Sequence, residues 1–270
     1  MKVSFMTFAC PQWRLPRVVD AAVGHGYHGI EFRTDAQHAH GIEVTSGKSQ
    51  RDEARKRCRG SGIEICCLAT SLQFATDHVI ADAPARIELA ADLECPALRV
   101  FCGPIPEGFT IEQTIEKVAA QLRQVAAVAA DHNVQLWLET HDTFSLGAYA
   151  GRAVRLADHP SVGINYDNMH PFRNGESLET TIAQLSPFIR HTHFHDSVSA
   201  PDQVVIKPLD TGELPMDDMM RALLSLGYTG YLSGEWFNTM YGSEPDESLA
   251  AYYRDMKTLV ERNGGELAAV

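Results

Sequence analysis

Three histidines alternate along one short stretch of this chain, and their spacing is the first sign of chemistry. Residues 191–195 read His-Thr-His-Phe-His, so in a β-strand His191, His193 and His195 share one face. Imidazole nitrogens buried on such a face are costly unless each finds a partner. A divalent metal provides one, because neutral imidazole is a common metal ligand. Solvated histidines at a strand end are the simpler alternative.

Acidic, basic and histidine side chains also stand at the ends of other apolar runs. In chain order they are Glu31 with Arg33, Arg99, Glu139 with His141, Asp167 with His170, and Glu235. Each alone has a structural explanation, such as a helix cap, an Asx turn or an ion pair between Glu235 and Arg99. Together, converging carboxylates would repel one another and have raised pKa values unless a cation neutralises them. Oxygen and nitrogen ligands without a thiolate suit Mn²⁺, Mg²⁺ or Co²⁺.

Strand-like and helical segments alternate along the chain. The predicted strands are 3–8, 30–33, 63–69, 97–102, 134–138, 162–166, 189–195 and 231–237. The predicted helices are 15–25, 50–59, 81–93, 110–130, 145–157, 177–185, 215–226 and 247–262. Eight such pairs predict an α/β fold, a single (β/α)₈ TIM barrel over residues 1–270, whose site lies at the carboxyl ends of the strands. An open doubly wound sheet is the alternative, but no Gly-x-Gly-x-x-Gly turn follows the first strand.

Composition narrows the class of protein. The 270 residues are 44% hydrophobic and carry a formal charge of −12, which argues against nucleic-acid and anionic-membrane partners. We expect no membrane span and no signal peptide, because no apolar run has the required length. The six cysteines show no metal-binding spacing, which is typical of reduced thiols in a cytoplasmic protein. A His-rich polar loop, with His38 and His40, runs through Gly47.

The residues at the strand ends resemble those of the xylose isomerase-like TIM-barrel superfamily of sugar isomerases and epimerases, and the likeness covers essentially the whole chain. The matching positions are Glu139 on strand five, Asp167 and His170 on strand six, His193 on strand seven, Glu235 on strand eight, and Arg99 on strand four. Residues 209–215 are similar to the family's Gly-x-Gly loop. The strand-seven motif is usually His-x-Lys-Asp, and here His195 replaces the lysine.

This resemblance implies a divalent metal (Mn²⁺, Mg²⁺ or Co²⁺) held by Glu139, Asp167, His193 and Glu235. It implies an isomerase or epimerase of a ketose, sugar phosphate or related polyol ketone, acting through a metal-stabilised cis-enediolate. Glu139 and Glu235 would exchange the proton from opposite sides of this carbohydrate substrate. The residues expected to contact the substrate are His170, Arg99, His195 and Glu31.

Three alternatives stay open. A metal-dependent dehydratase of an inosose- or dehydroshikimate-like ketone would use His141, two residues after Glu139, to protonate the leaving hydroxyl. A sugar-binding barrel without catalysis would lack a ligand, and none is missing. The residues Trp236, Phe237, Met240 and Tyr241 form either a homodimer face or a wall of the pocket.

Overall fold

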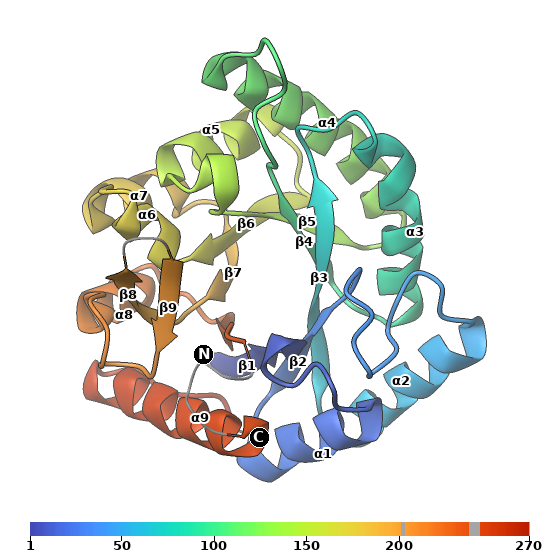
Figure 1. Ribbon diagram of the computed structural model, residues 1–270, viewed down its shortest axis with the longest axis vertical. Coiled ribbons are helices and arrows are strands. Elements are labelled where there is room, and N and C mark those ends of the chain that lie inside the picture. The colour runs from blue at the N-terminus through green and yellow to red at the C-terminus, as the bar shows by residue number, and fades with distance from the viewer. Residues whose placement is uncertain (201–202, 238–243, 270) are drawn as a thin grey trace.

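In the computed structural model, which describes residues 1–200, 203–237 and 244–269, parallel strands close into a barrel (Figure 1). The barrel strands are β1 (Lys2–Met6), β2 (Gly29–Arg33), β3 (Glu64–Gln73), β4 (Ala97–Phe101), β5 (Gln135–Glu139), β6 (Val162–Asp167), β7 (Ile189–His193) and β10 (Tyr231–Gly234). Around the ring they follow the order β1, β10, β7, β6, β5, β4, β3, β2. The predicted TIM barrel is confirmed.

Helices surround the barrel on its outer side (Figure 1). They are α1 (Leu15–His25), α2 (Lys48–Gly60), α3 (Val79–Asp92), α4 (Ile111–Asp131), α5 (Gly147–Ala157), α6 (Met169–Arg173), α7 (Leu178–Leu185), α8 (Met216–Ser225) and α9 (Pro245–Arg262), with the 3₁₀ turns η1 (Thr7–Ala9) and η2 (Asp142–Phe144). The longest, α4, begins with a capping box in which Thr110 Oγ1 accepts from the Gln113 backbone N–H and Gln113 Oε1 accepts from that of Thr110.

Side chains along each strand point alternately outward, to the helices, and inward, to the barrel lumen. On β5, Leu136 and Leu138 join the apolar core beneath the helices. Trp137 and Glu139 point the other way, where the indole stacks on His191 and the carboxylate meets His193. Because the strands are parallel, the inward residue at each carboxyl end lies at the same rim. The barrel lumen is therefore polar at this rim, and the helix-facing shell is apolar.

The predicted elements include neither the short helix α6 and the two 3₁₀ turns nor a hairpin at the rim of the barrel. After β7 the chain forms an antiparallel hairpin of β8 (Asp196–Ala200) and β9 (Gln203–Lys207). The predicted seventh strand ends two residues early, at His193, because the backbone N–H of His195 bonds the side chain of Asn168 instead of a neighbouring strand. The predicted eighth strand similarly ends at Gly234 rather than 237.

The carboxylate of Asp196 fixes the base of this hairpin. It accepts from the backbone N–H groups of Ser197 (2.8 Å), Gly212 (2.8 Å) and Leu214 (3.2 Å). A Cβ at position 212 would lie 2.1 Å from Asp196 Oδ1, so only glycine lets the loop approach this closely. The loop predicted over 209–215 thus holds the hairpin at the rim of the barrel.

Candidate metal centre and active site

The four predicted metal ligands come together at the carboxyl rim of the barrel. Glu139 ends β5, Asp167 ends β6, His193 ends β7, and Glu235 follows β10. One ligand atom from each lies within 4.8 Å of the others. Residues that are separated by almost a hundred positions in the chain therefore offer three carboxylates and one imidazole to a common point.

The contacts within this group fit a cation better than hydrogen bonds. His193 Nδ1 lies 2.8 Å from Glu139 Oε1 and 2.9 Å from Glu235 Oε2, yet one nitrogen carries at most one hydrogen. Among the described residues, Asp167 Oδ2 has no hydrogen-bond partner. Glu139 Oε2 meets Arg99 Nε at 3.2 Å as an ion pair. Buried oxygens without donors, beside an imidazole nitrogen, suit a divalent metal.

Charge at the rim supports the same conclusion. Burial alone would raise the pKa of the carboxyl groups, but His193 and Arg99 lower the pKa of Glu139 to about 2. His195 and His170 likewise hold the pKa of Asp167 below its ordinary value against the effect of burial. Burial would lower the pKa of His193, and the surrounding carboxylates Glu235, Glu31 and Glu139 raise it instead. The expected rise in carboxyl pKa is therefore not found, because histidine and arginine side chains already offset the carboxylates. The ionised carboxylate is nevertheless the form that binds a divalent cation.

A cavity of about 310 Å³ opens beside the ligand group. Its polar wall consists of Arg33, Arg99, His141, Asp167, His170, His195 and Glu235. Its apolar wall consists of Phe8, Phe101, Met169, Val204, Ile206, Trp236 and Phe237. The volume and the mixture of apolar walls with convergent polar groups suit a small organic ligand. Val204 and Ile206 belong to β9, so the unpredicted hairpin covers part of the site.

Two of the three histidines that line this cavity outside the ligand group, His141 and His170, lie against each other. The rings of His141 and His170 pack edge to face with centroids 4.4 Å apart, and His141 also lies against Phe101 at 4.7 Å. Within the described part of the chain His141 Nδ1 has no hydrogen-bond partner. Burial lowers the pKa of His170, although Asp167 acts in the opposite direction at 3.8 Å. Both side chains are placed to hold or exchange protons with a bound molecule.

The four residues predicted to bind substrate divide into three kinds. His170 faces the cavity. Arg99 and His195 line it but also hold ligands: Arg99 pairs with Glu139, and His195 Nε2 lies 3.2 Å from Asp167 Oδ1. Glu31 does not belong to the cavity wall, because it is fully buried beneath His193. The structure therefore does not support the expectation that Glu31 contacts substrate.

Sequence reasoning did not assign several residues of this wall. Arg33 ends β2 just as the predicted residues end their strands, and that position was the available signal. Phe8 lies in η1 and packs against Phe237 with ring centroids 5.0 Å apart. Trp236 and Phe237 line the cavity, as the pocket-wall alternative predicts. Met240 and Tyr241, named with them, lie outside the described residues.

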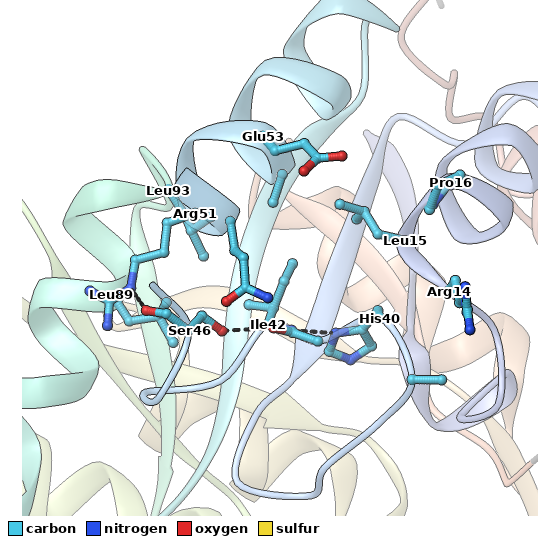
Figure 2. Close-up of a pocket in the computed structure, with 14 residues that line it drawn as sticks. Arg14, Leu15, Pro16, His40, Ile42, Ser46, Arg51, Glu53, Leu89 and Leu93 are labelled. Atoms are coloured by element: carbon cyan, nitrogen blue, oxygen red, sulfur yellow. Dashed lines mark hydrogen bonds between the residues drawn. The ribbon is translucent and has the colours of Figure 1, made fainter. Parts of the chain in front are cut away.

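A second hollow, of about 400 Å³, lies between α1 and α2 (Figure 2). Its wall includes Arg14, Glu53, Arg51 and the buried His40, whose ring is held by the local backbone. None of the residues that line this hollow belongs to a candidate metal-binding group found among the residues that the structure describes. The chemistry therefore points to the rim cavity rather than to this larger hollow. Across residues 1–200, 203–237 and 244–269, no helix is both long and apolar enough to span a membrane.

Comparison with known proteins agrees with the TIM-barrel fold described above. The model of the xylose isomerase-like TIM-barrel family matches residues 19–259. The chain is similar to 3-dehydroshikimate dehydratase of Bacillus anthracis, with 25% identity over 272 residues and 91% of each chain covered. It is also similar to fructoselysine 3-epimerase of Escherichia coli O157:H7, with 24% identity over 254 residues, covering 88% of this chain and 91% of the other. A solved structure of the IolI protein with a bound zinc atom superposes with a TM-score of 0.86 at 18% identity, covering 97% of this chain and 99% of that one.

Proposed function

This chain belongs to the xylose isomerase-like TIM-barrel family, and from that premise we propose that it is a divalent-metal-dependent isomerase or epimerase of a sugar or related polyol ketone. The observation that carries the proposal is the meeting of Glu139 and Glu235 at one nitrogen, His193 Nδ1, from β5 and from the end of β10. Strands β6 and β7 lie between them, so the two carboxylates reach the centre from different sides of the rim.

Glu139, Asp167, His193 and Glu235 would hold the cation. When bound, a divalent metal supplies Lewis acidity that makes a hydrogen on the carbon beside a carbonyl more acidic. The side chain of Glu235 is 20% exposed and lines the cavity, so it is the carboxylate better placed to take that proton. Glu139 is 1% exposed, so it would exchange a proton only with a substrate atom that lies directly at the metal-binding group. Return of the proton to the opposite face would invert the carbon. Return to the adjacent carbon would move the carbonyl, provided that the hydroxyl proton passes to the former carbonyl oxygen.

The wall residues would orient the substrate. His170 and His141 offer imidazole nitrogens to hydroxyl groups, and Arg33 and Arg99 bring guanidinium groups to the same cavity. Phe101, Trp236 and Phe237 present apolar surface that limits water around the reacting carbon. This combination of a polar wall and an apolar wall suits a small polyol ketone.

Solvent exchange tests this function directly. Metal-loaded protein in D₂O with a panel of ketoses should introduce deuterium beside the carbonyl of the true substrate, as followed by NMR. Glu235→Gln should slow exchange by about 10²- to 10⁴-fold, the usual contribution of a general base. Glu116→Gln, on the exposed face of α4, is the matched control and should exchange normally. Absence of exchange with every ketose or cyclic ketone, by protein that binds metal, contradicts the proposal.

A dehydratase is the second candidate, and His141 is the observation that favours it. Its ring lines the cavity two residues after Glu139 and, within the described chain, its Nδ1 has no partner, so it is free to protonate a departing hydroxyl. The similarity to a 3-dehydroshikimate dehydratase supports this reading as well. Formation of a conjugated ketone, seen as new ultraviolet absorbance with loss of water, would favour the dehydratase over the isomerase.

A further inference from the structure

Beneath the proposed metal centre lies a carboxylate that the reaction does not explain. Glu31, on β2, is fully buried in the barrel lumen. It accepts from Ser233 Oγ at 2.8 Å, and it lies 2.9 Å from His191 Nε2 and 3.1 Å from His193 Nε2. A buried carboxylate with this many donors is well satisfied and rigid. Its position under His193 rather than in the cavity assigns it a task other than substrate binding.

The two nitrogens of His193 meet different surroundings. Nε2 faces both oxygens of Glu31, at 3.1 and 3.2 Å, and also lies 3.1 Å from the side-chain amide nitrogen of Asn165. Nδ1 faces the ligand group, at 2.8 Å from Glu139 and 2.9 Å from Glu235. A neutral imidazole carries one N–H and one lone pair. If the hydrogen stays on Nε2 to bond Glu31, the lone pair of Nδ1 points to the place where the ligand oxygens converge.

The other neighbours of Glu31 keep it in this position. Ser233 and His191 both approach Oε2, one from β10 and one from β7. The ring of His191 is itself fixed, because it stacks on Trp137 with centroids 5.2 Å apart and planes inclined by 18°. Glu31 therefore cannot turn away from His193 without losing charge-assisted bonds in a place that water does not reach. The carboxylate is thus held by contacts with protein groups.

We propose that Glu31 is a positioning residue: it keeps the hydrogen of His193 on Nε2 and thereby presents Nδ1 to the metal. The inference rests on the proposed metal centre and adds to it a second layer of residues, Glu31 with Ser233 and His191. Carboxylates that orient a ligating histidine in this way usually affect metal affinity about 10- to 100-fold. His193 would thus be a ligand whose orientation is set from β2, far from it in the chain.

Metal affinity is the readout that tests this role. Protein stripped with chelator is titrated with Mn²⁺ or Zn²⁺ by calorimetry for wild type, Glu31→Gln and Ser233→Ala. Glu31→Gln keeps the shape but removes the charge, and its amide can donate to Nε2, so we expect affinity to fall about 10- to 100-fold. Ser233→Ala removes one donor to Glu31 and should cause a smaller loss in the same direction. Ser233→Ala also carries the test should Glu31→Gln fail to fold.

Glu64→Gln is the matched control. Glu64 is also on a barrel strand, but it pairs with Lys2 and accepts from Tyr231 rather than from a histidine, so its variant should bind metal as wild type does. In Zn²⁺-loaded protein, ¹⁵N NMR of the histidines should show the hydrogen of His193 on Nε2 and a mixture of tautomers in Glu31→Gln. If wild type binds and both variants bind equally well, Glu31 has no positioning role while the proposed function stands. If wild type binds no divalent metal, both the centre and the inference are wrong.

Discussion

Two segments of this chain are rich in histidine, and they have opposite characters. One runs from His191 to His195 along β7 and beyond, and the other is the loop that carries His38 and His40. In the first segment each imidazole faces a carboxylate: His191 and His193 contact Glu31, and His195 contacts Asp167. An imidazole beside a carboxylate donates an N–H to it, and this bond fixes the orientation of both side chains.

The loop histidine His40 is also buried but has different partners. Its Nδ1 accepts from the backbone N–H of Ile42 at 3.1 Å (Figure 2). Its Nε2 lies 3.3 Å from Thr7 Oγ1, and its ring meets Phe32 edge on. Burial lowers the pKa of His40 to about 3. This imidazole is a neutral packing group that closes a loop. Residue type and alternate spacing are the same in both segments. The groups bonded to the imidazoles differ: carboxylates in the first segment, and a backbone N–H donor at His40.

The sharpest test of this difference is a pair of alanine variants. His193→Ala should abolish the thermal stabilisation by Mn²⁺, Mg²⁺ or Co²⁺ and, with it, activity. In wild type that stabilisation amounts to about 2.7 kcal/mol when the metal is present at 100 times its Kd. His40→Ala should lower the melting temperature of stripped protein, because a buried hydrogen-bonded group is lost, and should keep the full response to metal. Melting curves with and without metal measure both effects, and a full metal response in His193→Ala would mean that the ligand group is misassigned.

A third kind of histidine sharpens the comparison. His141 has neither a carboxylate nor a backbone group bonded at Nδ1 in the described part of the chain, so it is available to the substrate. In an isomerase, His141→Gln should reduce kcat by about 10- to 100-fold through poorer orientation. In a dehydratase the same change should stop product formation and leave deuterium exchange nearly intact. His132→Gln, at the exposed end of α4, is the control and should behave as wild type in both assays.

A pH dependence of stability that arises in the loop is the last expected effect. The pKa of His40 is about 3 in the folded protein and about 6.5 in an unfolded chain. Below pH 6.5 the imidazole therefore binds a proton in the unfolded state but not in the folded state. As a result, the free energy of unfolding falls by about 1.4 kcal/mol per pH unit as the pH drops toward 3. His40→Gln should remove this contribution. Urea unfolding at pH 7, 5.5 and 4.5 compares the slopes, and equal slopes in wild type and variant would show that His40 is not the group responsible.

The sequence by itself determined the rim of the barrel. Strand periodicity and the alternation of strands with helices place Glu139, Asp167, His193 and Glu235 at carboxyl ends, and a parallel closed sheet brings all such ends to one side. The structure assembles the same four residues within 4.8 Å. Local pattern is sufficient to place these residues at the rim, because each residue's place depends only on its own strand. The family resemblance is what selected these four as ligands among the polar residues at the strand ends.

Tertiary structure alone decided what those residues touch. Glu31 lies 160 positions before His191, and only barrel closure and strand register place its carboxylate under His193 instead of in the cavity. The hairpin of β8 and β9 owes its position to Asp196, which bonds a loop 16 residues later in the chain. His40 and His193 likewise differ in partners that come from distant strands and turns. Partners across the barrel depend on how separate strands are aligned, and no local periodicity encodes that alignment.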